Sequence, residues 1–488
     1  MNLRRQVFSA TRWVAVSSAL RFLLQLVQTM VLARLLLPAE FGLMAVAGGF
    51  LAIMVVFADV GLNRALIRYR DLGPEALSSV FWLNLLVSLG LVLLVAALSP
   101  LFSAAFGEAG LTGVLAVASL TFPLSALGMQ FKVLAEKELQ FAALARNEVT
   151  AAVMGFMVAT AMALTGFGVY ALVGGALANT ATSSLLAWIW LSAGHRPSWH
   201  LRMAEVRPML GFGSYLVGER LANAINTQAD LFIGGLVAGP AAMGVYSVPR
   251  SLSLRLANTF VNPIVGRVGY PVMAKLQDDP PALRKVYLET LRMTASVNFP
   301  IYLLLAFFAP EVVGVLYGPR WHDAAFYLGI FAIWGLVRST VNPVGGLLAA
   351  TGHAHILFWW NVTLLGSISP ILWLAGSYGG LEGMAWTLLV FQFAFIWPAW
   401  RYMVKPACGA VFGEYVARLA LPFALALAAT AAGAWTAHLV GQDIPRLVVG
   451  TLVTGVLYLV LSYRFNRPWL DAMVTLMLPG RKAPRNEG

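Results

Sequence analysis

Long apolar segments follow one another along the chain, and only short polar stretches separate them. A helix needs about 20 apolar residues to cross the hydrocarbon core of a bilayer. Segments that approach or exceed this length lie at roughly 12–37, 41–62, 78–98, 112–128, 142–165, 168–193, 209–236, 241–266, 286–308, 324–350, 355–376, 381–400, 416–437 and 447–463. The pattern predicts an all-α membrane protein with about 14 transmembrane helices.

Polar residues recur inside several of these segments at helical spacing, three or four residues apart. Such a row lies on one face of the first predicted helix: Ser17, Arg21, Gln25 and Gln28. A similar row lies on the seventh: Glu219, Asn223, Asn226 and Asp230. Lipid offers no hydrogen bonds to a polar face, so each row must contact another helix or water.

A short motif, P-x-x-[FM]-G, occurs twice, at Pro38 to Gly42 and at Pro240 to Gly244. Polar positions of the preceding helices repeat at the same offset of 202 residues. We therefore predict two pseudo-symmetric lobes of six helices each, arranged as parallel repeats because six is an even number. The predicted parts are an N-terminal lobe, a C-terminal lobe, two additional helices and a basic cytoplasmic tail, at 1–208, 209–406, 407–464 and 465–488.

Composition supports the membrane assignment. Hydrophobic residues make up 59% of the chain and charged residues only 11%, whereas a soluble domain has about 25% charged residues. With the N-terminus placed in the cytoplasm, 24 Lys and Arg residues fall in cytoplasmic segments and two, Arg320 and Arg446, in outer loops. This bias predicts that both termini are cytoplasmic, in a bacterial inner membrane. It also explains the net charge of +12 without a nucleic-acid partner.

Arginines inside the apolar segments suggest a binding site. A lone arginine at the bilayer midplane costs about 2.5–3.5 kcal/mol or more, and buried acids are too few to pair with all of them. We expect a water-filled cationic cavity between the lobes, suited to a phosphate or diphosphate, lined by Arg21, Arg250, Arg255, Arg292 and Arg338. Interhelical ion pairing is the alternative. Candidates for coupling or gating are Asp59, Glu219, Arg220 and Asp230, and structural hydrogen bonding is equally compatible with Asp230.

Other chemistry finds no support in the sequence. No G-x-x-x-x-G-K-[ST] loop is present. Cys408 is the only cysteine, and His195, His200, His353 and His355 are read as loop residues without carboxylate or cysteine companions. We therefore expect no metal, no cofactor and no enzymatic activity.

Several stretches resemble a known family: ARLLLPAEFGLMAV, ADVGLNRALIRYRD, KELQFAALARNEV and ADLFIGGLVAGPAAMGVYSV. Their order and spacing are similar to those of Wzx-type polysaccharide repeat-unit flippases of the multidrug/oligosaccharidyl-lipid/polysaccharide (MOP) exporter superfamily. The resemblance extends from about Leu3 to Tyr402. One position departs from it, since Ala142 stands where an arginine is common.

The resemblance implies an alternating-access fold and a function. The substrate would be undecaprenyl-diphosphate-linked oligosaccharide, moved from the cytoplasmic to the periplasmic leaflet. A polysaccharide polymerase and a chain-length regulator would be partners. The alternatives are a peptidoglycan lipid II flippase or a drug/cation antiporter of the same superfamily, and, from another class, a membrane glycosyltransferase or polymerase.

Overall fold

The computed structural model describes residues 3–58, 66, 73–192, 194–256, 269–441 and 443–471. Helices make up almost all of these residues, and no strand occurs among them. The predicted all-α class is therefore confirmed. Packing divides the chain into two compact units: Met1–Ser247 with Phe358–Met384, and Val248–Leu357 with Ala385–Gly488. The lobe boundaries at 208 and 406 stay a prediction.

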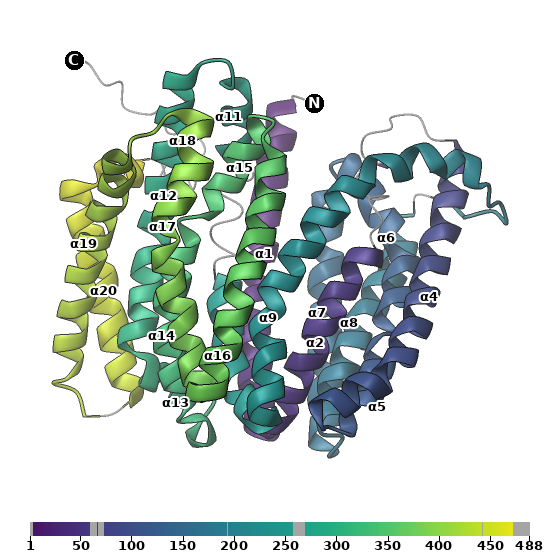
Figure 1. Ribbon diagram of the computed structural model, residues 1–488, viewed down its shortest axis with the longest axis horizontal. Coiled ribbons are helices and arrows are strands. Elements are labelled where there is room, and N and C mark those ends of the chain that lie inside the picture. Colours follow the sequence, from purple (N-terminus) through teal and green to yellow (C-terminus); the bar gives the residue numbers. More distant parts are fainter. Residues whose placement is uncertain are drawn as a thin grey trace. The chain divides into compact units, whose positions relative to one another are not determined.

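Among its described residues, the first unit contains seven complete helices and parts of two longer ones (Figure 1). The complete helices are α1 (Leu3–Leu35), α2 (Pro38–Ala58), α4 (Pro74–Phe106), α5 (Gly110–Ala118), α6 (Thr121–Lys137), α7 (Phe141–Leu164) and α8 (Val169–Trp190). The longer helices are α9 (Met203–Leu256) and α16 (Ala354–Ala394). Proline is the first residue of α2 and of α4. The first N–H groups of a helix have no acceptor within the helix, so proline, which lacks an N–H, is well tolerated there.

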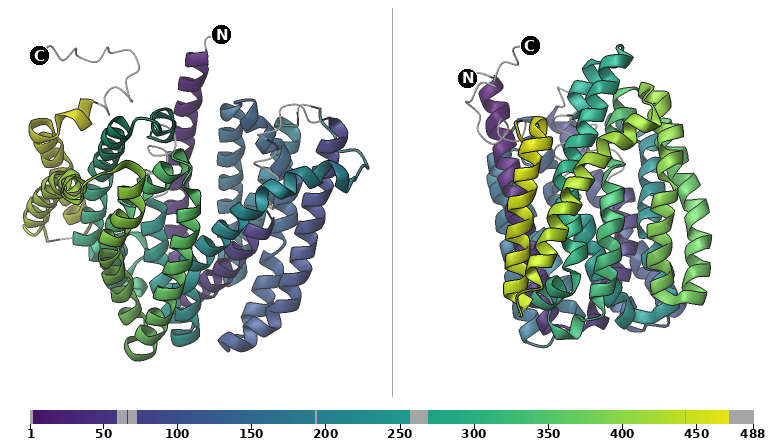
Figure 2. Two further views of the ribbon diagram at one scale, coloured as in Figure 1. Left: turned by 45° about the horizontal axis from the view of Figure 1, so that its top comes forward. Right: turned by 90° about the vertical axis from the view of Figure 1, so that its left-hand side faces the viewer.

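Among its described residues, the second unit holds the remaining parts of α9 and α16 and eleven further elements. These are α11 (Tyr270–Lys275), α12 (Pro280–Phe307), α13 (Ala309–Leu316), η3 (Pro319–Trp321), α14 (Ala324–Ser339), α15 (Asn342–Ala350), α17 (Ile396–Ala399), the π-helical turn η4 (Trp400–Val404), α18 (Lys405–Cys408), α19 (Phe412–Ala437) and α20 (Asp443–Phe465). The hairpin of α19 (yellow-green) and α20 (yellow) packs against α12 (Figure 2).

Twelve helical segments of the described chain are long and apolar enough to cross a membrane. Two of them contain a glycine with a positive φ, Gly239 at 74° and Gly380 at 58°, a backbone conformation that favours glycine. At these points one continuous segment divides into two helical arms. The fold is that of a multi-pass membrane protein, while the count of 14 spans stays a prediction.

Side-chain exposure follows the solvent that such helices meet. Large apolar side chains lie open, among them Leu93 at 72%, Leu164 at 69% and Trp435 at 70%. In water such a surface is a strong interaction patch, whereas lipid tails are themselves apolar. The interior of the first unit is built from apolar residues of α2, α4, α5 and α8, with Ala47, Val95, Val114 and Leu115 fully enclosed.

Small residues bring neighbouring helices close together. A Cβ at Gly155 of α7 would lie 2.8 Å from the backbone oxygen of Gly175 in α8. In the second unit, a Cβ at Gly433 of α19 would lie 2.7 Å from the backbone oxygen of Gly450 in α20. Close approach at small residues is the usual way in which membrane helices pack, because no hydrophobic effect drives them together in lipid.

The two P-x-x-[FM]-G motifs contact each other within the first unit. A Cβ at Gly42 would overlap the backbone oxygen of Pro240, and a Cβ at Gly244 would overlap that of Pro38. Each motif thus presents its glycine to the proline of the other. Such reciprocal contact is typical of a two-fold axis and is the arrangement expected if the motifs arose by duplication.

Candidate functional site

Arg21 of α1 pairs with a carboxylate that sequence reasoning did not propose. Its Nη1 lies 3.2 Å from Oε2 of Glu148 on α7. The exposed fractions of the two side chains are 39% and 38%, so neither charge is fully desolvated. Glu148 belongs to the apolar segment 142–165, where its neighbours in sequence gave no sign of a partner.

Asp230 is buried and hydrogen-bonded. The hydroxyl of Tyr246 donates to its Oδ2 at 3.1 Å, and the two residues are 3% and 0% exposed. The bond joins the two arms of α9 on either side of Gly239. Glu219 and Arg220 are half-buried on the same helix and also have interaction partners. Asp59 lies outside the described residues.

Four of the predicted cavity arginines lie in the second unit. Arg250 is 4% exposed and has a partner within the chain. Arg255 is half-buried near the end of α9. The guanidinium of Arg338 lies 5.1 Å from the ring centre of Trp334, one helical turn away on α14, in a cation–π contact.

Arg292 of α12 belongs to a polar network that reaches the end of α20. Its Nε donates to Oδ1 of Asn466 at 2.9 Å. Nδ2 of Asn466 donates to Oγ of Ser296 at 2.8 Å, and the hydroxyl of Tyr458 donates to the backbone oxygen of Ser296 at 2.6 Å. Asn466 is 0% exposed. Sequence reasoning placed this residue in a cytoplasmic tail and therefore missed its role.

Two interhelical ion pairs join α12 to α19. Arg418 Nη1 lies 2.9 Å from Glu289 Oε1, and Arg284 donates through Nε to Glu414 Oε2 at 2.8 Å. Arg418 thus pairs with the acid of α12 that lies one turn after Lys285. Neither Arg284 nor Arg418 stood out in the sequence, because basic residues are common at the ends of transmembrane helices.

One interpretation of the sequence was wrong: His200 does have carboxylate companions. Its Nε2 lies 3.0 Å from Glu205 Oε1 and 3.9 Å from Glu75 Oε2. Oγ of Ser79 donates to the other oxygen of Glu205 at 2.8 Å. The hydrogen bond from His200, followed by that from Ser79, lowers the pKa of Glu205. These bonds hold the loop before α9 against the first turns of α4. Packing of this loop therefore explains why the histidine and the two carboxylates lie together.

Solved structures with this fold are membrane transporters. A lipid II flippase, MurJ, in an inward closed conformation has a TM-score of 0.73 at 13% identity, covering 95% of this chain and 99% of that chain. An inward-facing multidrug resistance MATE family transporter of the MOP superfamily has a TM-score of 0.61 at 14% identity, covering 80% of this chain and 96% of that chain. The chain therefore shares the fold of these two transporters.

Sequence comparison defines the family. The model of the polysaccharide biosynthesis protein family matches residues 31–326. The lipopolysaccharide biosynthesis protein WzxC of Escherichia coli (strain K12) is 30% identical over 429 residues, which is 88% of this chain and 87% of the relative. The teichuronic acid biosynthesis protein TuaB of Bacillus subtilis (strain 168) is 25% identical, over 94% of this chain and 96% of the relative. The chain belongs to the polysaccharide biosynthesis protein family.

Proposed function

We propose that this protein is a flippase for undecaprenyl-diphosphate-linked oligosaccharide, the repeat unit of a bacterial surface polysaccharide. The family match and the MOP fold support transport in a polysaccharide pathway. The cargo moves from the cytoplasmic to the periplasmic leaflet of the inner membrane, and both termini lie in the cytoplasm. A polymerase and a chain-length regulator act after it. No covalent bond of the cargo is made or broken.

The observation that carries the cargo assignment is the set of arginines within the membrane segments. Arg21, Arg250, Arg255, Arg292 and Arg338 all lie in candidate spans. We propose that they line a cationic central cavity that binds the diphosphate. A guanidinium matches phosphate oxygens with a fork of N–H donors, and removal from water strengthens the attraction.

Arg292 illustrates how such a residue could serve both packing and binding. Its bond to Asn466 uses Nε, and among the described residues Nη1 and Nη2 have no hydrogen-bond partner. The bond fixes the guanidinium in one orientation before a ligand arrives. An oriented donor loses less entropy on binding than a mobile one.

Transport follows alternating access in this proposal. Asp59, Glu219, Arg220 and Asp230 are the candidates for gating or for coupling to an ion gradient; consumption of the product by the polymerase is the other possible driving force. Asp230 already has a structural partner in Tyr246, so a coupling role would require that this bond opens during the cycle.

The test replaces Arg250, Arg292 and Arg338 singly with Ala in a strain that lacks the chromosomal gene. Each variant should remain in the membrane, lose surface polysaccharide and accumulate the lipid-linked repeat unit. Arg320→Ala is the matched control, since Arg320 is exposed in the short helix η3 outside the spans. Normal export in all three variants would refute the cavity assignment.

The same strain separates the other functions of this superfamily. Cell lysis on depletion, with surface polysaccharide intact, would indicate a lipid II flippase instead. Drug resistance on expression would indicate an antiporter. Turnover of lipid-linked sugar by the purified protein would indicate an enzyme.

A further inference from the structure

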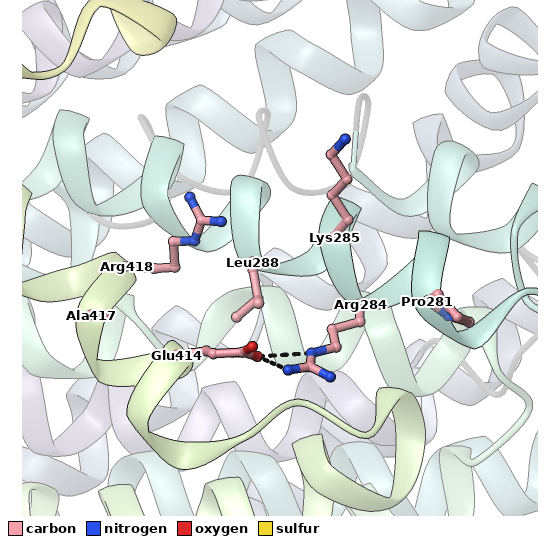
Figure 3. A pocket seen from close by; sticks show the side chains of 7 residues that line it. All are labelled: Pro281, Arg284, Lys285, Leu288, Glu414, Ala417 and Arg418. Atoms are coloured by element: carbon pink, nitrogen blue, oxygen red, sulfur yellow. Dashed lines mark hydrogen bonds and ion pairs between the residues drawn. The ribbon is translucent and has the colours of Figure 1, made fainter.

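A cationic pocket lies between the first turns of α12 and α19, within the second unit. Its volume is about 600 Å³, and it is lined by Pro281, Arg284, Lys285, Leu288, Glu414, Ala417 and Arg418. Figure 3 shows Arg284 and Glu414 extended toward each other, with Lys285 and Arg418 on either side of Leu288. Three basic side chains and one carboxylate thus line the pocket. None of these residues belongs to the proposed cargo cavity.

The charges of the pocket leave one positive charge in surplus. Glu414 occupies Nε and Nη2 of Arg284, and Glu289, beside the pocket, binds Nη1 of Arg418. Lys285 is exposed, and no carboxylate pairs with it in the part of the chain that the structure describes. Arg284 Nη1 and Arg418 Nη2 have no partner there either. These N–H groups and the Lys285 ammonium are donors available to an anion.

The pocket lies at the level where the lipid headgroups are expected. α12 begins at Pro280 and α19 at Phe412, and the pair Arg284–Glu414 aligns their first turns. Both helices then continue as apolar spans to Phe307 and Ala437. Leu288 and Ala417 form the wall on the apolar side of the charged groups. An amphiphile can therefore reach the cations from the bilayer.

A track of small side chains leads from the pocket along α19. Ala417, Ala420, Ala424, Ala428 and Ala431 are all exposed. They are three or four residues apart, so they lie on one face of the helix. Bulkier exposed residues, Phe423 and Leu427, stand beside this face. The track is shallow and apolar, which suits an extended hydrocarbon chain rather than a free phosphate ion.

We infer that this pocket binds the phosphate of an anionic membrane lipid, and that the lipid is a phosphodiester such as phosphatidylglycerol. One negative charge on the phosphodiester balances the one positive charge in surplus, whereas a polyprenyl diphosphate would bring more than the pocket can neutralise. The lipid chain lies along the alanine track. By bridging Lys285 on α12 and Arg418 on α19, the bound phosphate holds the hairpin of α19 and α20 to α12.

The experiment measures lipid binding to the full-length protein in detergent by native mass spectrometry and by thermal unfolding. Phosphatidylglycerol should bind and raise the unfolding temperature, and zwitterionic phosphatidylcholine should do neither. Lys285→Gln should weaken phosphatidylglycerol binding about tenfold, the loss of roughly one charge-assisted hydrogen bond. Lys285 forms no ion pair with any residue that the structure describes, so the fold should persist.

Lys275→Gln is the matched control: it removes the same charge from an exposed position on α11 that does not line the pocket. It should bind phosphatidylglycerol as the wild type does. Equal binding by the Lys285→Gln variant, or equal binding of phosphatidylcholine, would overturn the site. Tighter binding of a polyprenyl diphosphate, lost in Lys285→Gln, would overturn the phosphodiester assignment and give the pocket to the cargo lipid.

Ala424→Trp tests the track separately from the cations. It should weaken phosphatidylglycerol binding, because the indole fills the path of the hydrocarbon chain. Competition by millimolar inorganic phosphate should be weak for the wild type. Complete displacement of the lipid by inorganic phosphate, with no effect of Ala424→Trp, would show a free-anion site and refute the lipid.

Discussion

The contact between the two P-x-x-[FM]-G motifs gives a sharp prediction for Gly42→Ala and Gly244→Ala. A Cβ at Gly42 would lie 2.7 Å from the backbone nitrogen of Gly244 and overlap the oxygen of Pro240. A Cβ at Gly244 would lie 3.0 Å from Cα of Pro38. Ordinary contacts between such atoms are about 3.5–4.0 Å. All the obstructing atoms are backbone, so no side-chain rotation can relieve the overlap.

The magnitude follows from two opposing terms. Overpacking costs typically about 1–3 kcal/mol, and the upper end applies because the backbones of two helical segments must move apart. Alanine in place of glycine within a helix stabilises the folded state by up to about 1 kcal/mol. Each variant should therefore lose about 2 kcal/mol of unfolding free energy. Since both substitutions open the same contact, the double variant should lose less than the sum of the two.

The assay is thermal unfolding of purified protein in detergent, with surface polysaccharide measured in the deletion strain. Gly48→Ala on the same helix α2 is the control, because a Cβ there meets nothing within 4 Å. It should be neutral or stabilising by up to about 1 kcal/mol. If Gly42→Ala were as stable as Gly48→Ala, or if the two motif substitutions were additive, the direct contact of the motifs would be refuted.

Three further predictions concern buried or bonded polar groups. Asn466→Leu should cost about 2 kcal/mol of unfolding free energy, because it leaves Nε of Arg292 without its acceptor. Tyr246→Phe should cost about 1–2 kcal/mol, because buried Asp230 loses a donor. Glu205 has a lowered pKa, so its bonds stabilise the fold above the ordinary carboxyl pKa of about 4 and this contribution disappears as the pH falls through the lowered value. In Glu205→Gln the free energy of unfolding should therefore fall less steeply than in the wild type as the pH is lowered.

The controls for these variants come from the same chain. Tyr378→Phe removes a hydroxyl from a residue that is 91% exposed and should leave the unfolding temperature unchanged. The control for Glu205→Gln is Glu138→Gln, at an exposed acid at the end of α6. In this variant the free energy of unfolding should fall with decreasing pH as steeply as in the wild type. The corresponding hydrogen bond would be contradicted if Asn466→Leu or Tyr246→Phe unfolded at the wild-type temperature. The same holds if the free energy of unfolding of Glu205→Gln depended on acid pH as that of the wild type does.

Much of the fold can be predicted from short segments of the sequence, each taken by itself. A bilayer imposes one length and one polarity on every helix that crosses it, so a run of apolar residues predicts a span without knowledge of its neighbours. Gly239 with Pro240 likewise marks a break in α9 through local backbone preferences alone. The family resemblance rested on the same segments and was confirmed.

The partners of the polar residues depended on tertiary structure. Arg21 pairs with Glu148, 127 positions later in the chain, and Arg292 with Asn466, 174 positions later. Helical periodicity gives the face on which a side chain lies, but not which other helix covers that face. The sequence by itself determined that this is a helical membrane protein with arginines inside its spans. Only the tertiary structure decided which groups those arginines meet, because a hydrogen bond or ion pair needs two groups within a few ångströms, and chain folding alone sets that distance.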